Sequence, residues 1–184
     1  YTPILNDRGG YESDVVAMRL REDAYLIVTG SGQQVRDLDL LRRHIGPDEF
    51  VTLADMTSAY AVIGVMGPNA RDLLTRLSPN DLSNEAFPYM THREVEIGDT
   101  VARAARISYI GELGWELYVP SEAALPLYDR LYEAGADLGL ENAGSFAMAG
   151  LRIEKGHCAW GHDIGPDDTP LQAGMGFATK LSGK

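Results

Sequence analysis

The chain has 184 residues, of which 45% are hydrophobic and 23% are charged. This composition is typical of one globular domain of the α/β or α+β class, or of two small domains that share a core. The 27 acidic residues exceed the 16 basic ones, which gives a formal net charge of -11. Because nucleic-acid binding depends on Lys and Arg neutralising phosphates, this balance argues against a nucleic-acid partner.

The single cysteine and the lack of long apolar runs indicate the compartment. One cysteine, Cys158, excludes an internal disulfide framework and suits a reducing environment. No apolar run approaches the roughly twenty residues that cross a bilayer, and no basic-then-apolar leader is seen. We therefore expect no membrane partner and a cytoplasmic location, or the mitochondrial matrix in a eukaryote. The chain opens without methionine inside an apparent strand, so we expect an excerpt of a longer polypeptide.

The first fifty residues are predicted to form a meander followed by a helix. Extended runs cover residues 1–5, 11–20 and 24–30, and the first loop contains glycines that favour a turn. A surface helix is then predicted from Gln33 to His44, because apolar residues recur there at helical spacing. The apolar positions that define it are Val35, Leu38, Leu41 and Ile45.

The remaining residues alternate between hairpins and helices. Helices are predicted for the segment "GPNARDLLTRL", for a segment capped by Ser121, and from Ser145 to Lys155. Residues 156–176 are polar, rich in glycine and without periodicity, which is typical of a functional loop. Strands are predicted for "FVTLADM", "YAVIGVMG", a hairpin turning at Gly98 and Asp99, and "WELYVP". Hairpins with interspersed helices indicate the α+β class, with mainly antiparallel sheets and a few packed helices.

The run "YIGELGWELYVP" places a glutamate inside a strand. Side chains alternate along a strand, so Trp115 and Leu117 share the core face while Glu116 and Tyr118 share the other. Glu116 therefore points either to bulk water or into a concave surface. The nearby Gly111 and Gly114 would let another backbone or a ligand approach closely, and a carboxylate there can accept two parallel N–H bonds from a planar ligand edge. The pattern leaves both interpretations open.

Asp14 also has two interpretations. It follows a glycine loop in "GGYESDVVAM", where aspartate commonly caps a turn. The alternative is a general base whose pKa is set by a partly buried strand position. The sequence pattern does not decide between the two.

The segment "EKGHCAWGHDIGPDDTP" gathers His157, Cys158 and His162. Their spacing fits no structural zinc pattern, so we expect no metal. A nucleophilic role for Cys158 would need a positioned base that the sequence does not reveal. The glycines of "VTGSGQQ" lack both the third glycine of a dinucleotide fingerprint and the lysine of a phosphate loop, so this segment is a weak candidate.

Five segments, taken in chain order, resemble the folate-binding domain shared by two groups of enzymes. These are the aminomethyltransferase (T-protein) of the glycine cleavage system, and the C-terminal half of sarcosine and dimethylglycine dehydrogenases. The segments are "LNDRGGYESDVVAMRL", "AYLIVTGSG", "AVIGVMGPNARDLL", "SYIGELGWELYVP" and "LRIEKGHCAWGHDIGPDDTPLQAGMGF". Within them, "ESD", "VTG" and "GELGWE" are more similar to the dehydrogenase branch.

The resemblance implies a T-protein-like folate-binding domain, present in part. Residues 1–50 would be its first part and residues 51–184 the remainder, with a flavin domain and a C-terminal barrel outside this chain. Tetrahydrofolate is the implied cofactor, and FAD is expected only on the upstream domain. The implied partners are folate, an amine-derived iminium ion and the flavin domain of the same polypeptide. Oligomerisation is left open.

The resemblance also implies a role for each matching residue. Asp14 corresponds to the aspartate that assists proton transfer near the reacting nitrogens, and Glu116 to the glutamate that grips the pterin edge. Tyr109 lines the same pocket as Glu116. Thr29 stands where the T-protein has asparagine. Arg152 is kept, whereas Met148 replaces an arginine of the T-protein pattern, which weakens the implied contact with the far end of folate. The site residues implied by the resemblance are therefore Asp14, Thr29, Tyr109, Glu116 and Arg152.

The implied activity is one-carbon transfer. A flavin domain would oxidise an N-methyl amine such as sarcosine or dimethylglycine to an iminium ion, and the carbon would then pass to tetrahydrofolate to give 5,10-methylenetetrahydrofolate. Two alternatives remain. One is a stand-alone aminomethyltransferase that receives its methylene group from a lipoyl-bound carrier, and the other is a folate-binding module without catalysis.

Overall fold

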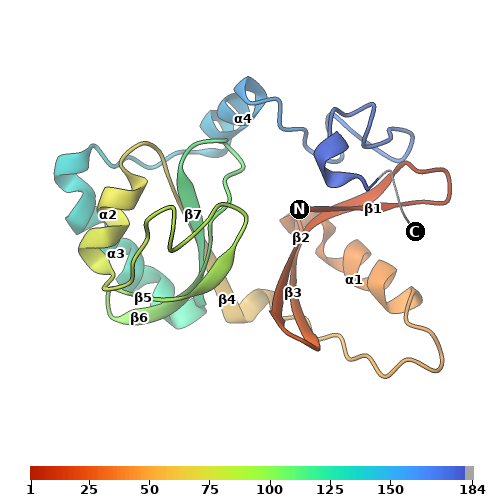
Figure 1. Cartoon of the computed structure of the whole chain (residues 1–184), viewed down its shortest axis with the longest axis horizontal. Coiled ribbons are helices and arrows are strands. Elements are labelled where there is room, and N and C mark those ends of the chain that lie inside the picture. Colours follow the sequence, from red (N-terminus) through yellow and green to blue (C-terminus); the bar gives the residue numbers. More distant parts are fainter. Residues whose placement is uncertain (181–184) are drawn as a thin grey trace. The chain divides into compact units, whose positions relative to one another are not determined.

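The computed structural model describes residues 1–180, which form two compact units (Figure 1). The first unit combines residues 1–54 with the segment from Cys158 onward, and the second comprises Asp55–His157. None of the helices in residues 1–180 is long and apolar enough to cross a membrane. The expected division of a folate-binding domain at residue 50 remains a prediction.

The first unit is built on a three-stranded antiparallel sheet and one helix. Its strands, in the order β1-β2-β3, are β1 (Thr2–Leu5), β2 (Tyr11–Arg21) and β3 (Ala24–Val28). Strand β2 pairs with both neighbours, opposing β1 through its first half and β3 through its second. A short 3-10 turn, Ser31–Gln33, leads into helix α1 (Gln34–Arg43). The predicted meander and helix are confirmed.

The segment after Cys158 in the first unit is a long loop with one 3-10 turn, Gly176–Ala178. It is fixed to the start of β2, because the Tyr11 amide donates to the Asp168 carbonyl at 3.1 Å. At Gly10 a β-carbon would lie 1.9 Å from the carbonyl oxygen of Pro166, so only glycine fits this close approach. The prediction of a long aperiodic segment is confirmed.

The second unit is a four-stranded antiparallel sheet covered on one face by two helices. The strand order is β4-β7-β6-β5, which places β7 between β4 and β6. The strands are β4 (Tyr60–Met66), β5 (His92–Ile97), β6 (Thr100–Ala105) and β7 (Gly114–Pro120). The helices are α2 (Ala70–Leu77), α3 (Ala124–Gly135) and the largely exposed α4 (Ser145–Glu154).

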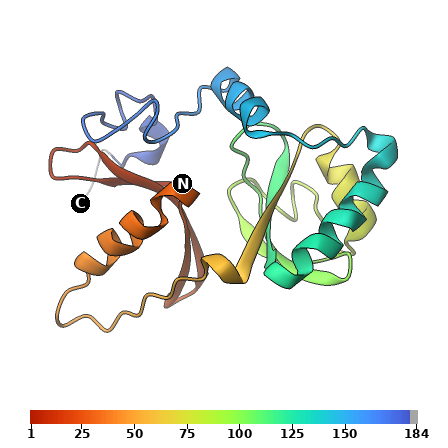
Figure 2. The ribbon, with the colours of Figure 1, turned by 180° about the vertical axis from the view of Figure 1, so that it is seen from behind.

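The core of the second unit lies between this sheet and helices α2 and α3 (Figure 2). Trp115 and Leu117 of β7 are completely buried there. They pack with Leu74 of α2 and Leu131 of α3, as the strand alternation predicts. The sheet's other face carries Glu116 and Tyr118, and that face gives the candidate site its frame. The mixture of antiparallel sheets and packed helices confirms the predicted α+β class.

Two local predictions are wrong, and the confirmed surface helix α1 buries residues other than the apolar ones that define its pattern. "FVTLADM" (residues 50–56) is largely exposed coil that pairs with no strand within residues 1–180, since β-propensity without a neighbouring strand does not make a sheet. Ser121 does not cap α3, because its hydroxyl donates instead to the Ser58 carbonyl at 2.8 Å. Val35 is 82% exposed, and the residues of α1 that are buried are Leu40 and the charged Asp37.

Candidate functional site

Asp14 lies within strand β2 and not in the turn before it. It is the fourth residue of the strand and directly opposes Pro3 of β1. Its neighbour Ser13 is fully buried, whereas Asp14 itself is half-buried. The turn is held instead by Asn6, whose side-chain oxygen accepts the amides of Arg8 and Gly10, each at 3.0 Å. The turn-capping interpretation of Asp14 is therefore wrong.

The surroundings of Asp14 raise the pKa of its carboxyl group above the ordinary value. Burial is the largest cause. The phenol of Tyr1 acts in the opposite direction, and the negative charge of Asp37 raises the pKa further. A raised pKa makes the Asp14 carboxylate a stronger base than a solvated aspartate, which suits proton abstraction at neutral pH.

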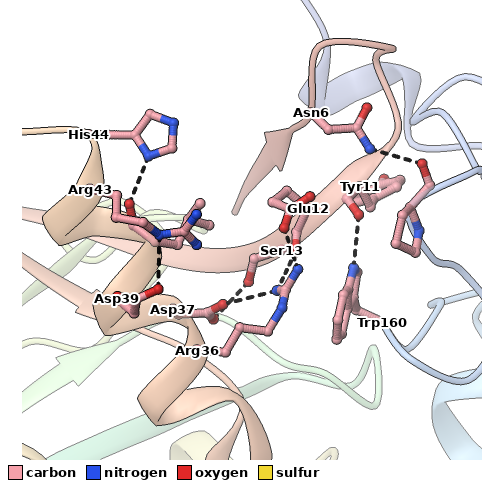
Figure 3. Close-up of polar contacts among 12 residues, drawn as sticks. Asn6, Tyr11, Glu12, Ser13, Arg36, Asp37, Asp39, Arg43, His44 and Trp160 are labelled. Carbon is pink, nitrogen blue, oxygen red and sulfur yellow. Dashed lines mark hydrogen bonds and ion pairs between the residues drawn. The ribbon is translucent and has the colours of Figure 1, made fainter.

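Thr29 lies directly after β3 and belongs to a polar network around Asp37 (Figure 3 shows its Ser13 and Arg36 contacts). The hydroxyl groups of Thr29 and Ser13 both donate to Asp37 Oδ2, with the Ser13 bond at 2.7 Å. Thr29 also lies 3.2 Å from the side-chain oxygen of Gln33. The structure therefore places Thr29 in a network that joins β2, the end of β3 and α1.

Arg36 of α1 extends this network toward β2 and Trp160 (Figure 3). Its guanidinium group lies 2.6 Å from the Glu12 carboxylate and 3.4 Å from that of Asp37. The same guanidinium group sits 4.6 Å from the ring centroid of Trp160. Trp160 in turn donates its indole N–H to the Tyr11 carbonyl at 3.3 Å. These contacts surround the strand segment that carries Asp14.

Glu116 occupies the third position of β7, on the face opposite Trp115. Across the sheet it opposes Gly64 of β4 on one side and Ala105 of β6 on the other. Directly opposed residues share a face, so Glu116 is flanked on that face by a glycine, which has no side chain, and by the methyl group of an alanine. Tyr118 shares this face, and its hydroxyl group donates to Glu116 Oε2.

Burial raises the pKa of the Glu116 carboxyl group, while the hydrogen bond from Tyr118 lowers it and only partly offsets the burial. The Tyr118 phenol is raised in pKa as well, first by burial and then by the nearby Glu116 charge. Tyr118 therefore stays protonated at neutral pH and remains a donor. One carboxylate oxygen of Glu116 accepts the Tyr118 hydroxyl, and the carboxylate retains further acceptor capacity for N–H donors of a ligand.

The glycines before Glu116 make room for the chain itself. At Gly114 a β-carbon would lie 2.6 Å from the Val65 carbonyl oxygen of β4. At Gly111, where φ is +75°, it would lie 2.3 Å from the side chain of Lys155. Of the two neighbours expected for these glycines, another segment of the chain is confirmed, with the β4 backbone at Gly114 and the Lys155 side chain at Gly111, whereas a ligand is not the neighbour at either position. Gly64, directly opposite Glu116, is exposed, and among residues 1–180 a β-carbon built there would come within 4 Å of the Met66 methyl group alone.

Tyr109 and Arg152 are brought together with His157 in the second unit. The Tyr109 ring stacks on the His157 imidazole with centroids 6.4 Å apart, and His157 Nδ1 lies 2.6 Å from the Tyr109 carbonyl oxygen. The Arg152 guanidinium group lies 6.0 Å from the Tyr109 ring and donates to the His157 carbonyl at 2.7 Å. Arg152 is buried. Both predicted residues thus have fixed positions.

The histidines and cysteine of the long loop do not gather into a metal-binding group. Among the residues that the structure describes, no three His, Cys, Asp or Glu side chains lie close enough to hold a metal ion. Cys158 is half-buried, with its sulfur 3.8 Å from the Ala173 carbonyl oxygen. His157 instead takes part in the contact with Tyr109.

The sequence does not predict the observed contacts of three residues, Asp37, Tyr118 and His157. Asp37 was missed because the helical pattern of α1 was judged on apolar positions. Tyr118 was placed on the correct face, yet its link to Glu116 needs the observed rotamers. His157 was considered only as a metal ligand. In the second unit, the loop carrying Tyr109 connects β6 to β7, the strands that bear Ala105 and Glu116.

The comparisons with known proteins agree with this arrangement. A family model described as the GCVT N-terminal domain matches residues 1–183. The chain belongs to the GCVT N-terminal domain family. The resemblance recognised in the sequence is thereby confirmed.

Relatives of this GCVT domain include oxidases and dehydrogenases of N-methyl amines. The 4-methylaminobutanoate oxidase (formaldehyde-forming) of Paenarthrobacter nicotinovorans is 47% identical over 98% of the chain, which covers 22% of that protein. The mitochondrial sarcosine dehydrogenase of Mus musculus is 40% identical over 98% of the chain, which covers 21% of that protein. The GCVT domain thus spans less than a quarter of these two relatives.

A solved structure shows the same fold. The glycine cleavage system aminomethyltransferase T from Bartonella henselae superposes with a TM-score of 0.80 at 28% identity. The match covers 97% of this GCVT domain and 46% of that chain. The T-protein-like fold predicted from the sequence is confirmed.

Proposed function

We propose that this GCVT domain transfers a one-carbon unit to tetrahydrofolate within a flavin-linked amine dehydrogenase. The substrate carbon is the methylene carbon of an iminium ion made by oxidation of an N-methyl amine such as sarcosine or dimethylglycine. The observation that carries the proposal is Asp14, a half-buried carboxyl group within β2 whose pKa is raised. Relatives named for the oxidation of N-methyl amines support the amine class.

The reaction requires protons to move between nitrogens. Tetrahydrofolate would be the second substrate: its N5 and N10 each exchange a hydrogen for a bond to the carbon, and the leaving amine takes up both hydrogens. No net oxidation occurs, since the flavin step precedes the transfer. Asp14 accepts a proton from a folate nitrogen and returns it to the amine nitrogen, so its carboxyl group is regenerated in each turnover.

The face of β7 that bears Glu116 fits a planar edge of N–H donors. The carboxylate is half-buried, opposes the side-chain-free Gly64, and accepts a hydroxyl from Tyr118. Charge-assisted bonds from a pterin edge to such a carboxylate are strong because solvent competes poorly there. We assign Glu116 to the pterin, with Tyr109 as an aromatic wall held by His157. We also assign Arg152 and Thr29 to the folate site, with smaller contributions to binding than those of Glu116 and Tyr109.

The product of the reaction tests the proposal. The intact parent protein is supplied with a 13C-methyl-labelled N-methyl amine, with and without tetrahydrofolate, and the label is followed by NMR. The proposal predicts that tetrahydrofolate diverts the label from formaldehyde into 5,10-methylenetetrahydrofolate. Equal formaldehyde yields with and without tetrahydrofolate would contradict it, and would instead resemble the formaldehyde-forming 4-methylaminobutanoate oxidase.

A second candidate is a stand-alone aminomethyltransferase that takes its methylene group from a lipoyl-bound carrier. The superposition on an aminomethyltransferase T favours it. The same product assay distinguishes the two, with an aminomethyl-lipoyl carrier protein in place of the free amine. Label transfer from the carrier and none from the oxidised amine supports the second candidate. A folate-binding module without catalysis would bind tetrahydrofolate and transfer label from neither donor.

A further inference from the structure

Asp37 is a charged residue buried in the first turn of helix α1. Its side chain is almost inaccessible, with the residue 3% exposed. A buried carboxylate is costly unless polar partners satisfy it. Here the Ser13 and Thr29 hydroxyl groups both donate to Oδ2, and Arg36 lies 3.4 Å from Oδ1. The structure therefore gives Asp37 two hydroxyl donors at one oxygen and a guanidinium group near the other.

The partners of Asp37 come from three different elements. Ser13 is the residue before Asp14 in β2, Thr29 follows β3, and Arg36 precedes Asp37 in α1. The hydrogen bond to Asp37 holds Ser13 in place. Asp14 is the next residue of β2, and its carboxyl group projects to the other face of the strand. The Asp37 carboxylate also acts on Asp14 through its charge, as one of the causes that raise the pKa of Asp14.

Asp14 and Asp37 are surrounded by a small number of other charged or titratable groups. The phenol of Tyr1 lies near Asp14 and lowers its pKa. Arg36 and Glu12 form an ion pair at 2.6 Å beside Asp37. Burial raises the pKa of the Tyr11 phenol, and the proximity of Asp14 and Cys158 raises that pKa further. Of these groups, Asp37 is the negative charge that is both buried and hydrogen-bonded to the residue adjoining Asp14.

We propose that Asp37 is a positioning residue for the one-carbon transfer: its buried carboxyl group anchors Ser13 and Thr29 by hydrogen bonds, and its charge acts from the opposite face of β2 to strengthen Asp14 as the base. The inference rests on the proposed function, since it assigns Asp37 a role through the base of that reaction. Asp37 itself touches neither substrate. The opposing view is that Asp37 only ties α1 to the sheet, in which case its loss would lower stability and leave the basicity of Asp14 unchanged.

The pH dependence of methylene transfer separates the two views. The rate falls at low pH as the base takes up a proton, so the acid limb of the profile reports the basicity of Asp14. Asp37→Asn keeps the shape of the side chain and removes its charge. In the intact protein it should move the acid limb to lower pH and reduce the plateau rate by about tenfold or less, well short of the 10²-fold typical of losing a general base.

Two further variants keep the test decisive. Asp39→Asn removes the same charge from an exposed position of α1, where Asp39 pairs with Arg43 at 2.9 Å, and should leave the limb in place. Arg36→Gln removes the cation beside Asp37 and should move the limb to higher pH, so it serves even if Asp37→Asn does not fold. The inference would be overturned if the acid limb of the pH–rate profile stayed in place in Arg36→Gln and in a folded Asp37→Asn. It would also be overturned if Asp39→Asn moved that acid limb as far as Asp37→Asn does.

Failure of the proposed function gives a different result. If Asp14→Asn transfers methylene as fast as the unmodified protein, Asp14 is not the base and the proposed function fails at that residue. If Asp14→Asn is slow but the acid limb ignores Asp37 and Arg36, the proposed function stands and the positioning role of Asp37 is wrong.

Discussion

The hydroxyl group of Tyr118 donates a hydrogen bond to Glu116, two residues earlier on the same face of β7. This bond partly offsets the effect of burial on the pKa of Glu116. The carboxyl group that we assign to the pterin therefore has an internal donor, which favours its charged form before any ligand arrives. Tyr118 thus prepares Glu116 to accept N–H donors.

The variant Tyr118→Phe tests the effect of this hydrogen bond on Glu116. Without the hydroxyl donor the pKa of Glu116 should rise further, because burial is no longer opposed. Folate binding should then be lost at a higher pH than in the unmodified protein, with an affinity change of about tenfold or less at neutral pH, the scale of one hydrogen bond. Calorimetric titrations between acid and neutral pH measure this. Identical pH profiles for the two proteins would show that the Tyr118 bond does not tune Glu116.

Glu116→Gln should weaken folate binding and stabilise the free protein at neutral pH. A carboxyl group whose pKa is raised by folding contributes most stability below its unfolded pKa, and this contribution is lost as the pH rises through the folded pKa. Its ordinary value is 4.5, so the stabilising effect of glutamine should appear at neutral pH and vanish toward pH 4. Folate affinity should fall by roughly 1–3 kcal/mol.

Thermal unfolding and calorimetry of the same samples check both effects of Glu116→Gln. The control is Glu96→Gln, which changes an exposed glutamate on the edge strand β5 and should alter neither quantity. A lower melting temperature at neutral pH for Glu116→Gln would show that burial of the charge is not unfavourable there.

Two glycine substitutions separate packing from binding on the same pair of strands. Gly114→Ala places a β-carbon 2.6 Å from the Val65 carbonyl oxygen, and overpacking of this kind costs about 1–3 kcal/mol of stability. In Gly64→Ala the new β-carbon would lie 3.5 Å from the Met66 methyl group, an ordinary van der Waals contact, so the fold should tolerate it. Because Gly64 directly opposes Glu116, the added methyl group should weaken folate binding. Equal affinity in Gly64→Ala would place the pterin elsewhere.

His157 should act on folate only through Tyr109. Tyr109→Ala and His157→Ala are each expected to weaken folate binding, because the imidazole stacks on the tyrosine ring and contacts its carbonyl group. The double variant should then be little worse than Tyr109→Ala, with a coupling of about 0.5–3 kcal/mol between the two sites. Strictly additive losses in a double-mutant cycle would indicate that His157 acts independently of Tyr109.

The sequence predicted side-chain orientation most accurately where a strand has a regular alternation and one buried face. Alternation in β7 correctly separated Trp115 and Leu117 from Glu116, because a strand packed on helices allows only one register. The same reasoning was wrong for residues 50–56, where β-branched composition was present but a neighbouring strand was not. Strand formation depends on that partner, which local sequence does not specify.

The candidate site was less accessible to sequence reasoning. Alternation could not decide between water and ligand for Glu116, and the roles of Asp14 and Glu116 came from the family resemblance. Asp37 was hidden because burial of a charge depends on donors far away in the sequence, Ser13 and Thr29. The sequence also could not decide whether a ligand or another part of the chain approaches Gly111 and Gly114, and the structure places Lys155 and Val65 there.

The most direct test of the central claim is the rate of methylene transfer in Asp14→Asn, measured in the intact protein beside its folate affinity. The control is Asp7→Asn, in the exposed turn before β2. We predict a folate affinity close to that of the unmodified protein and a transfer rate lower by about 10²-fold or more, the usual scale for losing a general base. An unchanged transfer rate with little free formaldehyde would contradict the account, because the proton would then be moved by another group.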